Sequence, residues 1–96
     1  MDNYFRTTVN EFAKFLAFIE QENPTLTPQR ETLGMKDSFK LNMLLDQPKT
    51  VKGPHYTQDQ YPVIDLMFEL ALAGRFFVRG KDSKNGKGKL QLLRAN

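Results

Sequence analysis

The fold is decided by the stretch at residues 60–93, which reads QYPVIDLMFELALAGRFFVRGKDSKNGKGKLQLL. Its first fifteen residues are almost all apolar, with Pro62 suited to a first helical turn and Gly74 to a helix end. They predict a helix over 60–74. Two short apolar runs then flank a turn-rich segment, which is the pattern of a β-hairpin from about 76 to 93.

The register of this hairpin depends on the length of its loop. In a hairpin, the numbers of any two opposed residues add up to the same register sum, and this sum is odd for a tight two-residue turn. Placing Phe76 and Val78 on one face with Leu90 and Leu92 requires an even sum, and therefore a longer loop or a bulge. We expect the longer, mobile loop.

A first helix is expected near the N-terminus. Thr8 and Glu11 have the spacing of a capping box, so the helix is predicted to run over 8–22, where Asn23-Pro24 ends it. Phe18 falls on the opposite side from the predicted core stripe. That stripe consists of apolar residues at helical spacing: Phe5, Val9, Phe12, Leu16 and Ile19.

Between these elements the chain predicts a short extended piece and a second helix. Leu26-Thr27 lies between two X-Pro junctions and is therefore extended, able to pair with the hairpin. The helix covers 36–46, with Asp37 near its positive N-terminal end. The order helix, extended piece, helix, helix, hairpin is that of a winged helix. We predict an α+β, mainly helical, winged-helix-like single domain over 1–96, with the hairpin as its wing.

Composition excludes several classes of protein. The 96 residues contain no cysteine, which removes disulfide frameworks, thiolate catalysis and cysteine-based zinc sites. No run approaches the roughly 18 apolar residues of a membrane span, and the N-terminus lacks the order of a signal peptide. The expected setting is cytoplasmic, with no membrane partner.

Catalytic and cofactor sites are not indicated. His55 is the single histidine and has no partner at a useful spacing. Asp65 and Glu69 are four residues apart on the predicted third helix and are interpreted as its solvated edge. The loop at 80–88 departs from a phosphate-binding loop because no helix follows it. We expect no catalytic residue, no metal, no cofactor and no small-molecule substrate, and hence no enzyme.

Charge is distributed unevenly along the chain. Residues 1–74 hold seven Lys/Arg and ten Asp/Glu, a net charge of −3, whereas residues 75–96 hold seven Lys/Arg and only Asp82, a net charge of +6. The basic loop suits contacts with nucleic-acid phosphates, or else acts as a solvated guard against edge aggregation. The candidate nucleic-acid residues are Arg79, Lys81, Lys84, Lys87 and Lys89. The predicted third helix offers no cation or amide to read bases.

The helices carry more apolar residues than one core requires. On the third helix the predicted core face comprises Val63, Ile64, Leu66, Met67, Leu70 and Ala71. A protein interface is predicted from the residues left outside the expected core faces: Phe18, Phe39, Phe68 and Leu72. The alternative is that the loop 47–59, with Val51 and Tyr56, folds back and covers them.

Several short motifs lie within residues 26–93: Leu26-Thr27, Lys36-Asp37, Leu41-Asn42-x-x-Leu45, Tyr61-Pro62 and Ala73-Gly74-Arg75. Their pattern resembles that of a helical module found in uncharacterised bacterial proteins, some related to plasmid-encoded open reading frames. The resemblance implies a small winged-helix-like accessory domain and no activity. We therefore expect a non-catalytic protein-interaction or oligomerisation module, binding another domain of a longer chain or a second copy. Nucleic-acid binding through the wing is the alternative.

Overall fold

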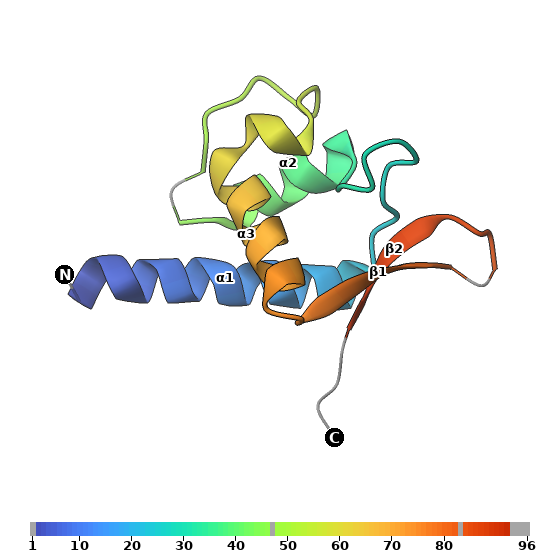
Figure 1. Ribbon diagram of the computed structural model, residues 1–96. Coiled ribbons are helices and arrows are strands. Elements are labelled where there is room, and N and C mark those ends of the chain that lie inside the picture. The colour runs from blue at the N-terminus through green and yellow to red at the C-terminus, as the bar shows by residue number, and fades with distance from the viewer. Residues whose placement is uncertain (1, 47, 83, 93–96) are drawn as a thin grey trace.

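Three α-helices precede an antiparallel β-hairpin in the computed structural model, which describes residues 2–46, 48–82 and 84–92 (Figure 1). The elements are α1 Asp2–Glu22, α2 Met35–Leu44, the short 3-10 helix η1 Gln58–Gln60, α3 Pro62–Ala73, β1 Phe77–Lys81 and β2 Gly88–Leu92. The α+β, mainly helical layout with a C-terminal hairpin is confirmed.

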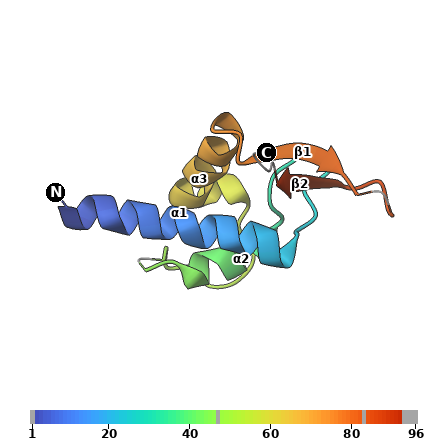
Figure 2. The ribbon, with the colours of Figure 1, turned by 90° about the horizontal axis from the view of Figure 1, so that it is seen from below.

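The helices pack as a three-membered cluster in which each contacts the other two. Seen from below, α2 and α3 lie on opposite sides of α1, and the hairpin projects past the C-terminal end of α1 (Figure 2). The N-terminal turns of α1 extend beyond both neighbouring helices in the two views. The hairpin and the two faces of the cluster are therefore separate surfaces.

The start of α1 differs from the prediction. The helix begins at Asp2, so Thr8 lies inside it and the capping-box interpretation was wrong. Glu11 is buried and turns toward α2, where both of its carboxylate oxygens accept the backbone N–H of Asp46 at 3.1 Å. A residue expected to begin α1 instead helps to hold the chain just after the end of α2.

The buried face of α1 is also turned relative to the predicted stripe. Phe15, Phe18 and Ile19 are buried, whereas Val9 is half-exposed. The exposure predicted for Phe18 was wrong because α2 packs against the side of α1 that carries Glu11 and Phe18. Phe5 belongs to the predicted stripe, but its side chain lies outside the described residues.

The second helix is shorter than predicted and ends at Leu44. It buries Ser38, Leu41 and Asn42, while Leu44 is exposed. The Asn42 side chain donates to the backbone oxygen of Lys49 at 2.8 Å and accepts its N–H at 2.9 Å. This pair of bonds draws the following loop onto the helix.

The loop that follows Lys49 partly covers the core. Val51 and Tyr56 are half-buried and pack against it. The loop therefore folds back on the core, whereas neither Val51 nor Tyr56 lines the groove that contains Phe18 and Phe39. Position 47 of the predicted loop lies outside the described residues.

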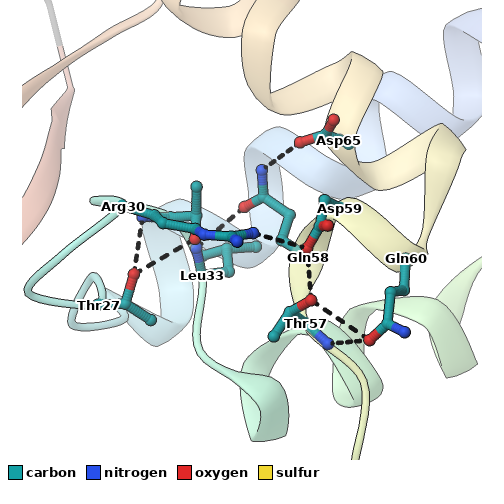
Figure 3. A network of polar contacts seen from close by, with 9 residues as sticks. Thr27, Arg30, Leu33, Thr57, Gln58, Asp59, Gln60 and Asp65 are labelled. Atoms are coloured by element: carbon teal, nitrogen blue, oxygen red, sulfur yellow. Dashed lines mark hydrogen bonds and ion pairs between the residues drawn. The ribbon is translucent and has the colours of Figure 1, made fainter.

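The core face of α3 is set by a buried glutamine of η1. Gln58 accepts the N–H of Leu33 at 2.9 Å and donates to the carboxylate of Asp65 at 2.9 Å (Figure 3). Asp65 is thus held at the border between the buried and the solvated side of α3, and it does not lie in the middle of the solvated side. Phe68 is fully buried, which makes its predicted exposure wrong.

The side of α3 expected to be core is exposed in part. The structure buries Ile64, Met67, Phe68 and Ala71. Val63, Leu66 and Leu70, all predicted for the core, face solvent.

The hairpin has the predicted longer loop but not the predicted face. Phe77 lies opposite Leu92 and Arg79 opposite Leu90, which is an odd register sum. Phe77 and Leu90 are buried, so Phe76 and Val78 are directed outward, contrary to the prediction. Position 93 of the predicted hairpin lies outside the described residues.

The short extended piece pairs with the hairpin as predicted. Leu26 donates its N–H to the oxygen of Gly88 at 2.7 Å, and Thr25 forms an antiparallel bridge with Lys89. Leu26 also bridges Leu33 across a tight bend. These contacts dock the hairpin against the segment that joins α1 to α2.

Candidate interaction surfaces

An apolar strip runs along the solvent side of α3. Val63, Leu66 and Leu70 recur at i, i+3 and i+7, so they lie on one face of the helix. They are exposed to 50%, 59% and 48% of their surface. The core residues of the same helix, Ile64, Met67, Phe68 and Ala71, lie on an adjoining face, which makes α3 apolar on two sides. A helix of that kind is normally buried all round.

Phe76 extends this strip beyond the end of α3. A Cβ built on Gly74 would lie 3.0 Å from the Phe76 ring and 3.1 Å from the carbonyl oxygen of Leu70. The ring therefore lies over the last turn of α3 and also meets Phe12 edge-on, at 5.3 Å between centroids. Phe76 remains 44% exposed. We call Val63, Leu66, Leu70 and Phe76 the α3 strip.

A second apolar surface is a groove of about 640 Å³ between α1 and α2. Ala17, Phe18 and Gln21 recur at helical spacing and form the α1 wall, and Phe39 and Met43 form part of the α2 wall. The structure thus brings together two of the four predicted interface residues, Phe18 and Phe39. Phe18 is buried in the groove floor, and Phe39 is half-buried.

The other two predicted interface residues lie elsewhere. Phe68 is buried against Phe15, with the rings edge-on at 6.5 Å. Leu72 is half-buried against the core. An interface role for Phe39 and Leu72 stays a prediction. The α3 strip was missed, although the nearly uninterrupted apolar sequence of the helix signals a second apolar side.

Ion pairs bound the groove. The Lys14 ammonium lies 2.5 Å from the Asp46 carboxylate and 3.5 Å from that of Glu11, and Lys40 lies 3.4 Å from Glu22. The hydrogen bond that Lys14 donates to the Asp46 carboxylate raises the pKa of Lys14 above its usual value. These rim charges are satisfied within the chain, so the groove itself is largely uncharged.

Within the predicted basic set, Arg79 has a structural role. Its guanidinium lies 5.4 Å from the centre of the Phe68 ring and donates to the backbone oxygen of Glu31 at 3.1 Å. The Glu31 carboxylate lies 3.9 Å from the same guanidinium. Arg79 therefore ties the hairpin to the core and to the preceding loop through its Nε, while its side chain stays 37% exposed.

The four lysines of the set lie further out. Lys81, Lys84 and Lys87 are exposed, and Lys89 is half-buried. Within the described residues, none of these four lysines forms an ion pair.

The remaining polar candidates have structural surroundings. Asp65 holds the buried Gln58, and His55 is exposed beside Gly53. Within residues 2–46, 48–82 and 84–92, no group of three metal-ligating side chains is found. No helix in the described part of the chain is long and apolar enough to cross a membrane.

Comparisons with known proteins return no match: no family model, no curated protein and no solved structure is significantly similar to this chain.

Proposed function

We propose that the chain is a non-catalytic protein-interaction module and that it associates with a second copy of itself through the α3 strip. One observation carries the proposal: α3 is apolar on two sides, and only one of them is covered by the described residues. Exposing such a surface to water is unfavourable, and contiguous apolar patches of a few hundred Å² commonly mark interfaces.

The geometry of the strip supports a second copy as the partner. Two α3 helices related by a two-fold axis perpendicular to them would run antiparallel, so that Val63 of one copy meets Leu70 of the other and the two Leu66 side chains lie near the axis. Each copy then covers the apolar strip of its partner with an identical strip, as an isologous interface requires. The i, i+3, i+7 spacing is that of helix-to-helix packing.

The size of the strip indicates a weak dimer. Four half-exposed side chains of about 150–200 Å² each leave roughly 300–400 Å² of apolar surface per copy. A standard interface buries about 800 Å² per partner, so the strip supplies the centre and polar neighbours the rim. Interfaces at the small end of the range are typical of weak, transient association, and we propose a dissociation constant of about 10–100 µM.

Sedimentation velocity over a range of concentrations tests this proposal. Leu66→Glu places a charge near the two-fold axis, and two Leu side chains per dimer lose about 1.5–3 kcal/mol each. The dissociation constant should rise by about 100-fold or more. Met43→Glu is the matched control, because Met43 is also 59% exposed but lies in the groove between α1 and α2.

The outcomes distinguish the α3 strip from the groove between α1 and α2 as the dimer interface. A concentration-dependent dimer that Leu66→Glu dissociates and Met43→Glu preserves supports the α3 strip. A wild-type protein that stays monomeric to millimolar concentration contradicts self-association. Loss of the dimer in the Met43 variant alone transfers the interface to the groove and contradicts the assignment to α3.

We further propose a cytoplasmic setting for this module. A chain of 96 residues without cysteine suits a reducing compartment. The winged-helix-like interpretation is supported by the element order and by the pairing of Leu26 with the hairpin.

A further inference from the structure

The wing, residues 79–89, keeps its lysines free by satisfying its own turn internally. Asp82 accepts the N–H of Lys84 at 2.7 Å through its side chain, and Asn85 accepts that of Lys87 at 2.8 Å. Gly86 takes the left-handed conformation that the turn needs, with φ of 71°. The one acidic side chain of the wing is thereby occupied, while Lys81, Lys84 and Lys87 are exposed and Lys89 is half-buried.

Two of these lysines border a hollow of about 450 Å³ between the hairpin and residues 25–31. Lys81 and Lys87 line it from the wing, and Thr25 contributes a hydroxyl group from the other side. Glu31 also lines the hollow, but its carboxylate is paired with a guanidinium of the hairpin. Ammonium and hydroxyl donors around a shallow opening suit the oxygens of a phosphodiester.

We propose that the wing is a nucleic-acid-binding site that grips the phosphate backbone without reading bases. Lys81, Lys84, Lys87 and Lys89 supply the charge, and Arg79 anchors the base of the wing against Phe68. Lysine contacts to phosphates add affinity through counterion release and carry no sequence information.

The charge of α3 excludes base recognition by that helix. Its two ionisable residues, Asp65 and Glu69, are acidic, and phosphates would repel them. The solvent side of α3 is apolar, unlike a recognition helix that presents Arg, Lys, Asn or Gln to a groove. The wing therefore binds as an isolated basic finger, and any base sequence serves.

A lipid surface is a less suitable partner for the same charges. Stable binding to a membrane needs apolar side chains inserted beside the cations. The described tip of the wing offers Lys84, Asn85, Gly86 and Lys87, none of which is apolar. Phosphodiester chains need only the charge and the donors.

Fluorescence anisotropy with a labelled duplex of mixed sequence, about 20 base pairs long, tests the proposal. With about four phosphate contacts the logarithm of affinity should fall against the logarithm of salt with a slope of about −3 to −4, or roughly 100-fold between about 50 and 200 mM. Lys84→Ala with Lys87→Ala should lower the slope by about 2. The control, Lys36→Ala with Lys52→Ala, removes the same charge from exposed positions outside the wing.

Each result decides the matter. The proposal is supported if only the wing variant loses affinity and salt dependence. The wild-type protein should also bind a scrambled duplex with equal affinity. The proposal is overturned by an absence of binding at 50 mM salt, by equal losses in both variants, or by strong preference for one sequence. Wing-dependent binding to anionic vesicles without binding to the duplex also overturns it. Because the wing and the α3 strip are different elements, each result is independent of the sedimentation test.

Discussion

Replacing Gln58 by alanine removes two buried hydrogen bonds at one position. Gln58 is 1% exposed, and its amide joins the loop before α2 to the first turn of α3. The same amide holds Asp65 beside the buried face of α3. Gln58→Ala therefore tests how much this buried contact contributes to stability.

The magnitude follows from the two bonds. The Leu33 N–H is left buried without its acceptor, which costs about 1–3 kcal/mol. The bond to the Asp65 carboxylate is charge-assisted and contributes about 1.5–3 kcal/mol. We expect a loss of about 3–5 kcal/mol from a domain whose total stability is about 5–15 kcal/mol.

Urea unfolding followed by circular dichroism measures this loss. The midpoint should fall by about 2–3 M at the denaturant dependence typical of small proteins. Gln29→Ala, at an exposed position in the loop 27–33, should change stability by about 0.5 kcal/mol or less. A double-mutant cycle with Asp65→Ala should give a coupling of about 1 kcal/mol or more. A loss below about 1 kcal/mol for Gln58→Ala would refute the reasoning.

Two further predictions concern the core. Phe68→Ala should destabilise the domain by about 3–5 kcal/mol, because Phe68 is fully buried. Leu66→Ala should cost under about 1 kcal/mol in the monomer, because Leu66 is exposed. Similar losses of stability for the two variants in denaturant titrations would contradict this difference in burial. Tyr61→Phe should leave stability at pH 7 unchanged or higher, since the buried hydroxyl has no partner within the described residues. Burial, and then the neighbouring Tyr56, raise the pKa of Tyr61. The phenol of the unfolded chain ionises near pH 10. As the pH rises from there through the folded pKa, the wild-type protein should lose stability relative to Tyr61→Phe. Parallel profiles of stability against pH from 8 to 11 for the two proteins would contradict this.

Element positions could be predicted because they depend on local signals. Asn23-Pro24 ends α1, Pro62 begins α3 and Gly74 follows its end, as expected from the fixed φ of proline and the conformational freedom of glycine. The pairing of Leu26 with the hairpin followed from two prolines that keep the segment extended. These effects act within a few residues and need no knowledge of the tertiary structure.

The faces of the helices could not be predicted in the same way. An α3 sequence with only two charges has no clear polar side, and Asp65 was assigned to solvent although Gln58 binds it. Glu11 was assigned to a helix cap although the chain after α2 supplies its partner. Both errors come from side-chain partners distant in sequence, which periodicity does not reveal.

The hairpin register shows the same limit. The loop length followed from the turn-rich sequence, but the choice of face depended on the core. Phe77 packs inside because it lies opposite Leu92 in the observed register, and Phe76 then turns outward toward the end of α3. Phe76 could be assigned to the α3 strip only from the three-dimensional structure.

Oxidative cross-linking of a single-cysteine variant tests the α3 dimer most directly. The chain has no cysteine, so Leu66→Cys introduces one thiol, and Met43→Cys provides an equally exposed control in the groove. A disulfide forms when two Cβ atoms lie about 3.5–4.5 Å apart, which is expected near the two-fold axis. We expect Leu66→Cys to form a covalent dimer rapidly at about 50 µM, close to the proposed dissociation constant, while Met43→Cys stays largely monomeric. Equal, slow cross-linking of both variants would contradict this expectation.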